Sequence, residues 1–417
     1  MGKKLLILVL LISLKVGAQS STFSRIDSLV EKGRYQLALK NLFEIDTATH
    51  LSQYKIGAIY SSIDNHRTAI EYYKASLKFK ENYSAKLMLG KSYQKLRKYD
   101  KAMRVYEELL QTDDKNLVLA YQLGKLYAVK YKLLEAEKLF KDLIKKDATN
   151  ANYYYQLGLV YGKMKRGNLM LDYFLKAFNN DHTHIKSIYQ LAKNFTRIKK
   201  KDSAKIFVNK GLELDSLNLN LNKLKINELF RNKKYRKAIT VLTLLDSVAP
   251  YQLYTNKMLG RSYFNIDSLD LAEKHFNQAL GIDIDDFRIL TYLGHISKMK
   301  KQYRYAQYHY WSAITRGRKS RHDEFYSLGL LHLELKEAKM AIAMFKASIK
   351  ESNRYYKVLY QLALTSDSFY KDKKIAYKYY EDYLNRFEIK DKELTTFVKN
   401  RMKEIKEELF MKGKLTE

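Results

Sequence analysis

The most regular pattern along the chain is a column of apolar and small residues that returns about every 34 residues. A leucine and the residue after it form the column, as in Leu89-Gly90 and Leu123-Gly124. The second position of the column is occupied by Gly57, Gly90, Gly124, Gly158, Ala192, Ile226, Gly260, Gly294, Gly329 and Ala363. A fixed period in this range predicts a chain built from stacked copies of one small structural unit.

Three more columns keep the same phase, at three, twelve and sixteen residues after the small position. In the repeat of Gly90 they hold Tyr93, Ala102 and Tyr106. The first column shares one helix face with the small residue, and the other two share one face of a second helix. Short polar segments such as residues 96–100 separate the two stretches. The pattern predicts antiparallel helix pairs, each burying its apolar faces against neighbouring pairs.

These columns resemble the tetratricopeptide repeat family over residues 50–385. The resemblance implies an all-α fold: a right-handed superhelical solenoid of antiparallel helix pairs, with about ten to eleven repeats. The chain departs from the family in losing most aromatics four residues before the small position, and in keeping only Pro250 as a repeat-end proline. We expect these losses to change the angles between repeats and to leave the fold unchanged.

The expected boundaries follow from the repeat phase. We expect a degenerate first repeat over residues 19–49, the solenoid over residues 50–386, and a C-terminal helix and tail over residues 387–417. The last helix carries an apolar stripe that includes Leu394, Val398 and Ile405. A solenoid needs a polar cap over its open end, so we interpret this helix as a cap, with a partner-binding helix as the alternative.

Residues 1–18 read as a secretory signal peptide. Lys3 and Lys4 precede an apolar run over residues 5–14, and the small residues Gly17 and Ala18 precede Gln19, the expected new N-terminus. The run is short for a bilayer span, although an uncleaved anchor is the alternative. We therefore expect an exported protein of the periplasm or outer cell envelope. Cleavage before glutamine suggests a Bacteroidota-like source.

The chain carries a formal net charge of +32 and no cysteine. The positive charge predicts attraction to anions. The alternative is that a gene rich in A and T, which favours lysine codons, accounts for part of this charge. The absence of cysteine excludes disulfides, cysteine nucleophiles and thiolate metal sites. Low glycine and proline contents, 16 and 1 residues, agree with long helical stretches.

The sequence carries no complete catalytic or metal-binding motif. HExxH, GxSxG and a full P-loop are all missing. His182 and His184 form an HxH pair beside Asp181 at a repeat junction, where a solvated turn is the simpler interpretation. Asp283, Asp285 and Asp286 lack the glycine and distal glutamate of a calcium loop. We predict a protein that is not an enzyme and that binds no metal or cofactor.

The resemblance implies that the first helix of each repeat lines an inner groove, at positions three before, one after and four after the small residue. Tyrosine offers a large rigid contact area, and the cations beside it would receive acidic groups. Packing between repeats is the alternative for a chain with 36 tyrosines. The predicted groove residues are Tyr54, Lys91, Tyr121, Lys125, Tyr155, Tyr189, Lys193, Lys223, Asn227, Lys257, Arg261 and Tyr326.

Part of this set resembles the carboxylate clamp that some family members use for a partner's C-terminus. Lys223 and Asn227 match its first pair, whereas Met258 and Tyr292 stand where asparagine and a basic residue are required. Arg288 does match a basic position of the clamp, so the match is half a clamp, and we do not assign that peptide specificity.

The predicted function is that of a scaffold that binds an extended or acidic segment of a partner protein. The alternative is binding of an anionic polymer or a membrane surface through distributed positive charge. No nucleic acid partner is expected, because no recognised nucleic-acid module occurs. The sequence leaves the oligomeric state open.

Overall fold

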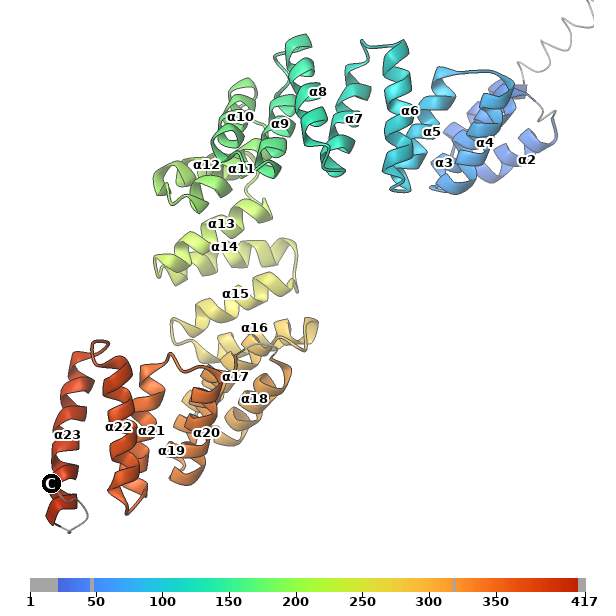
Figure 1. The fold of residues 1–417 in the computed structure, drawn as a ribbon. Coiled ribbons are helices and arrows are strands. Elements are labelled where there is room, and N and C mark those ends of the chain that lie inside the picture. The colour runs from blue at the N-terminus through green and yellow to red at the C-terminus, as the bar shows by residue number, and fades with distance from the viewer. Residues whose placement is uncertain (1–21, 46–48, 318–319, 412–417) are drawn as a thin grey trace, which may run out of the picture. The chain divides into compact units, whose positions relative to one another are not determined.

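The computed structural model describes residues 22–45, 49–317 and 320–411. Within these ranges the chain is helical and contains no strand, which confirms the predicted all-α fold (Figure 1). The predicted signal peptide, residues 1–18, and the last residues of the tail lie outside the described residues. None of the described helices is both long enough and apolar enough to cross a membrane.

The chain divides into two units, residues 1–216 and 217–417, and each is described by itself. Unit 1 begins with a helix over residues 22–31 that pairs with α2. After α2, each first helix of unit 1 packs against the second helix that follows it, from α3 with α4 to α11 with α12. Its helices are α2 (Tyr35–Phe43), α3 (His50–Ser62), α4 (His66–Phe79), α5 (Tyr83–Lys95), α6 (Tyr99–Thr112), α7 (Leu117–Val129), α8 (Leu133–Lys146), α9 (Ala151–Lys163), α10 (Gly167–Asn180), α11 (Ile185–Arg197) and α12 (Lys201–Leu214).

Unit 2 continues the same alternation of first and second helices and ends with one extra helix. Its helices are α13 (Leu219–Arg231), α14 (Tyr235–Val248), α15 (Leu253–Phe264), α16 (Leu269–Ile282), α17 (Phe287–Met299), α18 (Tyr303–Arg316), α19 (His322–Glu334), α20 (Ala338–Glu351), α21 (Tyr356–Phe369), α22 (Lys373–Phe387) and α23 (Lys392–Met411). The predicted helix pairs are therefore confirmed.

In the seven described pairs whose small position is glycine, this glycine contacts the aromatic ring sixteen positions later. A Cβ atom placed on Gly158 would lie 2.7 Å from Cδ1 of Phe174, and one on Gly124 would lie 2.8 Å from Cζ of Phe140. Both rings are buried. Glycine is needed here because any side chain would occupy the space of the ring.

In two repeats the small position holds a larger residue than glycine, and the position sixteen residues later holds a smaller residue than an aromatic one. Where the small position holds Ala192, the aromatic position holds Val208, and where it holds Ile226, the second position holds Leu242. All four side chains are buried. A larger residue on the first helix is thus accompanied by a smaller one on the second, which keeps the filled volume similar.

Most first helices end in the same tight turn. In the turn after α5, Arg97 adopts a left-handed conformation with φ of 56°, and the Lys98 N–H donates to the Tyr93 carbonyl over 2.9 Å. This is a Schellman motif, in which glycine is usually favoured at the left-handed position. Glycine occupies it only in the first turn of the described chain, at Gly33. The non-glycine residues there are Asp64, Arg97, Tyr131, Lys165, Lys199, Lys233, Asp267, Lys301 and Lys336.

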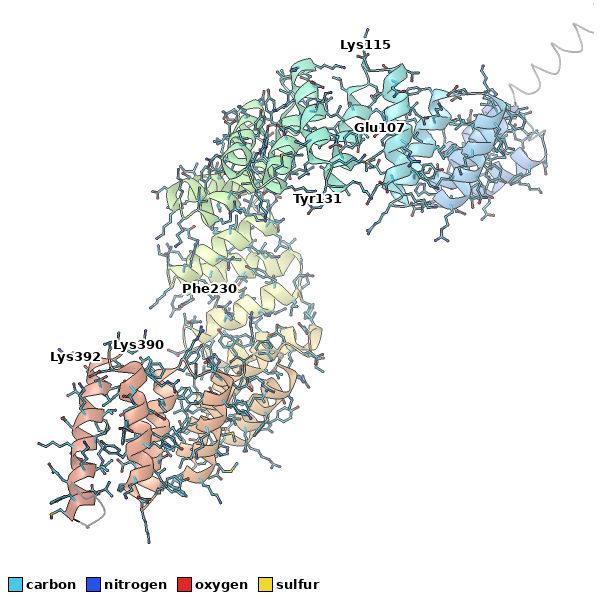
Figure 2. The ribbon with its side chains drawn as sticks, in the orientation of Figure 1. Glu107, Lys115, Tyr131, Phe230, Lys390 and Lys392 are labelled. Carbon is cyan, nitrogen blue, oxygen red and sulfur yellow. The ribbon has the colours of Figure 1, made fainter. Side chains whose placement is uncertain are left out.

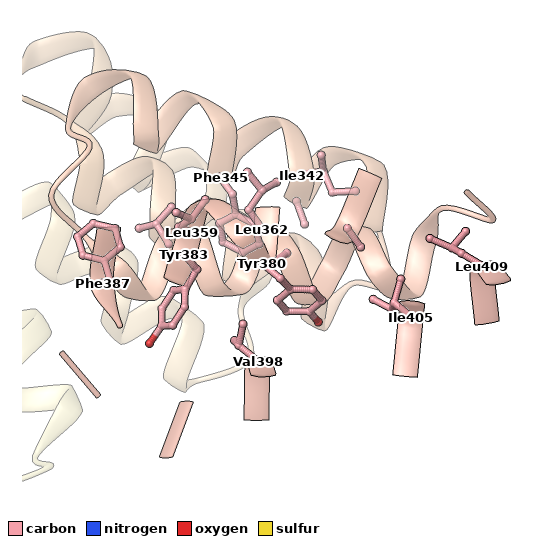
Figure 3. Close-up of a cluster of buried hydrophobic side chains, with 14 residues drawn as sticks. Ile342, Phe345, Leu359, Leu362, Tyr380, Tyr383, Phe387, Val398, Ile405 and Leu409 are labelled. Carbon is pink, nitrogen blue, oxygen red and sulfur yellow. The ribbon is translucent and has the colours of Figure 1, made fainter. Parts of the chain in front are cut away.

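The helix α23 covers the end of unit 2. Val398, Ile405 and Leu409 of α23 are buried in one cluster with Tyr380 and Tyr383 of α22 (Figure 3). The opposite side of α23 carries charged residues. This arrangement matches the predicted polar cap, because the apolar stripe found in the sequence is the face that α22 buries.

Candidate functional site

Unit 1 contains a groove of about 880 Å³, formed mainly by the first helices α5 and α7. Four cations line it, and no acidic side chain does. Its apolar surface comes from leucine, valine and tyrosine side chains. The lining residues are Leu87, Lys91, Gln94, Lys95, Arg97, Tyr99, Tyr106, Asn116, Val118, Leu119, Gln122, Lys125, Leu126 and Val129. We call this the unit 1 groove.

Unit 2 contains a second groove of about 1010 Å³, which the first helices α15, α17 and α19 line. It is rich in aromatic side chains and contains charges of both signs. Its charged lining residues are Lys257, Arg261, Arg288, Lys298, Asp323 and Glu324. We call this the unit 2 groove, and its mixed charge distinguishes it from the unit 1 groove.

Two of the predicted cations lie in the unit 2 groove in different states. Lys257 forms an ion pair with Asp286, the residue that caps the N-terminus of α17 by accepting from the Arg288 N–H over 3.1 Å. The Arg261 guanidinium lies 5.1 Å from the ring centre of Phe230, and its Nε is buried with no hydrogen-bond partner among the described residues. Arg261 therefore forms no ion pair with a described residue, whereas the charge of Lys257 is already compensated.

A buried carboxylate in the unit 2 groove was missed by the sequence analysis. Glu324 is 6% exposed and accepts a hydrogen bond from the Thr291 hydroxyl over 2.7 Å. It lies five residues before the small position Gly329. The equivalent positions in the neighbouring repeats hold Ile289 and Val358, which are buried. The signal was a single charge in a column that is otherwise apolar or small.

His295 is the second polar group inside the unit 2 groove. Its Nδ1 lies 2.8 Å from the Tyr310 hydroxyl, and its ring packs against Phe264 and Tyr292. Burial lowers the pKa of His295, with a further contribution from Lys298. The imidazole is therefore neutral at neutral pH.

The predicted groove tyrosines are largely packing residues. The Tyr121 ring lies 6.1 Å from that of Phe140, and the Tyr155 ring lies 5.7 Å from that of Phe174. Tyr54 and Tyr326 contact the equivalent rings of Tyr73 and Phe345 in their own repeats. These side chains are half-buried and lie on the ring that fills each helix pair, so only part of each tyrosine is available to a partner.

Other predicted residues lie against tyrosine rings. Lys125 Nζ is 5.4 Å from the ring centre of Tyr121, and Lys193 Nζ is 5.9 Å from that of Tyr189. In unit 2, Lys223 Nζ is 4.7 Å from the ring centre of Tyr254. These are cation–π distances, and they hold the lysine heads above apolar surface.

Only some of the twelve predicted groove residues lie together in one of the two grooves. Lys91 and Lys125 share the unit 1 groove, and Lys257, Arg261 and Tyr326 share the unit 2 groove. The residues of the set that line neither groove are Tyr54, Tyr121, Tyr155, Tyr189, Lys193, Lys223 and Asn227.

The histidine pair of the α10–α11 turn has a structural role. The His182 ring packs on Phe178, with ring centres 4.7 Å apart. His184 caps α11 by accepting from the Ser187 N–H, and its ring lies against Tyr155. Across the described parts of the chain, no cluster of three or more histidine, aspartate or glutamate side chains is arranged to hold a metal ion.

Comparison with known proteins agrees with the repeat architecture. Residues 51–83 and 83–116, which span α3–α4 and α5–α6, match the family model of the tetratricopeptide repeat. No curated protein matches the chain in sequence.

Among solved structures, the APC/C hetero-tetramer Cut9–Hcn1 is similar over 89% of this chain and 82% of its own, with 16% identity and a TM-score of 0.44. Yeast Tom70 is similar over 93% of this chain and 95% of its own, with 13% identity and a TM-score of 0.40. YrrB, described as having an unusual peptide-binding site, is similar over 40% of this chain and 87% of its own, with 20% identity and a TM-score of 0.37.

All three TM-scores are below 0.5, so the fold assignment rests on the helix pairs described above. Two adjacent pairs match the family model, and the same pair recurs with the same contacts along both units. Residues 51–116 thus match the tetratricopeptide repeat, whose family members generally mediate protein–protein interaction.

Proposed function

We propose that this chain is a non-enzymatic scaffold that binds an extended, acidic segment of a partner protein in the unit 1 groove. The observation that carries the proposal is the charge of that groove: Lys91, Lys95, Arg97 and Lys125 line it without any acidic side chain. A carboxylate entering the groove would meet several cations, and charge-assisted hydrogen bonds are the strong ones.

The apolar surface of the same groove supports a peptide ligand. Leu87 and Val118 line it together with the cations, and Val118 is 73% exposed. An extended peptide would cover these side chains while its acidic groups contact Lys91 and Lys125. Burial of this exposed apolar area would then add to the affinity. The charged contacts weaken as salt is added, so affinity from charge alone would depend strongly on salt.

We also propose that the scaffold works outside the cytoplasm, in the periplasm or outer cell envelope. The support for this is the signal-like pattern of residues 1–18 in the sequence. Mass spectrometry of the N-terminus of the chain isolated from its native cells tests it. A mature chain that begins at Gln19 would support export, and an intact Met1 on cytoplasmic material would contradict it.

Binding of an acidic peptide tests the groove. We expect a fluorescent peptide that alternates glutamate and leucine to bind the chain, and the Lys91→Gln/Lys125→Gln variant to bind it about tenfold more weakly, because two charged contacts are lost. Fluorescence anisotropy across a salt series measures both affinities.

The matched control removes two exposed lysines from second helices of unit 1, Lys74→Gln/Lys138→Gln, which carry the same charge outside the groove. Equal weakening in both variants would mean that the peptide responds to net charge, and the groove proposal would then be wrong. A lysine-leucine peptide that binds as well as the glutamate-leucine peptide would contradict the acidic preference.

A further inference from the structure

The two edges of unit 1 carry opposite charge. The turns between the first and second helix of four consecutive pairs, residues 96–98, 130–132, 164–166 and 198–200, contain two cations each and no acid. The turns at the other edge, residues 80–82, 113–116, 147–150 and 181–184, contain five acidic residues and the two lysines Lys80 and Lys115, so this edge is net acidic. Figure 2 shows Tyr131 and Lys115 at these two edges.

We define the basic ridge as the eight cations of the first set of turns. All eight side chains are exposed. Lys130 pairs with Asp100 and Arg166 approaches Glu137, while the other six form no ion pair with any described residue. The members of the ridge are Arg97, Lys98, Lys130, Lys132, Lys165, Arg166, Lys199 and Lys200.

Helix stability does not explain the ridge. Lys98, Lys132, Arg166 and Lys200 occupy the N-cap positions of α6, α8, α10 and α12, and none makes a side-chain capping bond. Lysine and arginine cannot accept the orphan N–H groups there, and their charge opposes the positive end of the helix dipole. Arg97, Lys165 and Lys199 also hold left-handed conformations, which are unfavourable for residues with a Cβ.

The opposite edge follows the ordinary rules of capping. Asn82, Asn116 and Asn150 cap α5, α7 and α9 through their side-chain oxygens. Asp147 and Asp181 accept backbone N–H groups within their own turns. On the ridge's own edge, the α3–α4 turn carries no lysine or arginine, and there Asn65 caps α4 through its side chain. Uncapped starts are not confined to the ridge, since Arg34 begins α2 without a capping bond, but Asn65 shows that this kind of turn accepts a capping side chain.

Exposed apolar side chains lie among the cations of the ridge. Tyr131 and Leu134 are 72% and 71% exposed, and Val129 and Ile198 are also exposed. Three of these four belong to the α7–α8 turn and its flanks, between Lys130 and Lys132 and beside them. Apolar residues with this exposure mark an interaction surface when they are grouped.

We infer that the basic ridge of unit 1 binds the surface of an anionic lipid bilayer. The cations contact lipid phosphates, and Val129, Tyr131 and Leu134 enter the boundary between headgroups and acyl chains. Charge complementarity requires an anionic partner, and the apolar group among the cations selects a partner with an apolar phase. A linear polyanion satisfies the first condition and leaves the aliphatic side chains in water.

Vesicle flotation tests the inference. The full chain is expected to bind vesicles of phosphatidylcholine mixed with phosphatidylglycerol, and to leave vesicles of phosphatidylcholine alone. The variant Lys98→Asn/Lys132→Asn/Arg166→Asn/Lys200→Asn should lose at least about tenfold in partitioning, since each basic residue near the surface contributes to attraction. Because asparagine is a good N-cap, this variant should melt at the same temperature or higher, so unfolding cannot explain the loss.

The control variant Lys74→Gln/Arg104→Gln/Lys138→Gln/Lys186→Gln removes the same charge from exposed helix positions of unit 1. It should lose less than about threefold in partitioning, and a loss equal to that of the ridge variant would overturn the inference. The variant Val129→Ser/Tyr131→Ser/Leu134→Ser should bind the mixed vesicles more weakly and bind heparin, an anionic polymer without an apolar phase, unchanged. Vesicle binding that survives both the ridge and the apolar substitutions would also overturn it.

Discussion

Replacing Phe174 with alanine is expected to lower the free energy of unfolding around α9 and α10 by about 3–5 kcal/mol. The ring is 1% exposed and fills the space opposite Gly158, so its removal leaves a cavity that the two helix backbones cannot close. Urea denaturation followed by circular dichroism measures the loss, and hydrogen exchange locates it in unit 1. The control is Phe79→Ala, since Phe79 is 55% exposed and its truncation should cost little.

The same contact predicts a compensating pair. Gly158→Ala alone should destabilise the chain, because its Cβ would lie 2.7 Å from Phe174 Cδ1, and overpacking commonly costs about 1–3 kcal/mol. Gly158→Ala together with Phe174→Val should be less damaging than the two single effects added, as the natural pair of Ala192 with Val208 indicates. A double-mutant cycle measures this coupling, and additive effects would show that the two positions do not share one space.

Replacing Arg401 with methionine is expected to detach α23 from the end of unit 2. Arg401 Nε lies 2.7 Å from Asp367 Oδ2 and Nη2 lies 3.1 Å from Oδ1, so the guanidinium binds the buried carboxylate with two bonds. Losing one partner of a buried pair costs about 3–5 kcal/mol, and Lys373, 3.1 Å from Asp367 Oδ1, should keep this case near the lower end. Hydrogen exchange of α23 peptides measures the detachment.

Two variants check this result. Lys399 lies on α23 like Arg401, and Lys399→Met removes its more exposed ion pair with Glu388 at the end of α22, which should change stability by less than about 1 kcal/mol. Asp367→Asn in the Arg401→Met background removes a buried charge that only Lys373 still pairs with, and should restore part of the protection of α23. If Arg401→Met leaves exchange of α23 unchanged, the apolar cluster alone holds the helix.

The attachment of α23 should also depend on acid. Burial alone would raise the pKa of Asp367, but hydrogen bonds from Arg401 and Lys373 outweigh it and lower the pKa. An aspartate in an unfolded chain titrates at about pH 4, so the stabilisation is fully present above that pH. It is lost as the pH falls through the lowered pKa of the folded state. Hydrogen exchange of α23 over an acid series should therefore show release in wild type and a weaker pH dependence in Arg401→Met.

The fold was predictable because each helix pair is a local structure. The spacing of Leu89, Gly90 and Tyr93 defines one helix face, and that of Ala102 and Tyr106 defines the next. These residues are close in the chain and meet within one pair, so their contacts follow from periodicity alone. The same holds for the apolar stripe of α23, whose Val398 and Ile405 are buried as their spacing predicts.

The candidate site was predictable only in part, because grooves form between repeats. The columns identified Lys91, Lys125 and Arg261, but periodicity could not say that Asp286 already neutralises Lys257. Periodicity also could not show that the rings of Tyr121 and Tyr155 pack against Phe140 and Phe174. Both facts depend on side-chain directions across a helix pair or a repeat boundary.

The basic turns illustrate the same division. The sequence by itself determined which residues are cationic, where each pair turns, and that the small positions accept a ring from the second helix. Only the tertiary structure decided that Lys98, Lys132, Arg166 and Lys200 share one edge, that they stand at uncapped helix starts, and that Glu324 is buried in a groove. The reason is physical: backbone periodicity is set by neighbours in the chain, whereas charge pairing and burial are set by residues about one repeat length away.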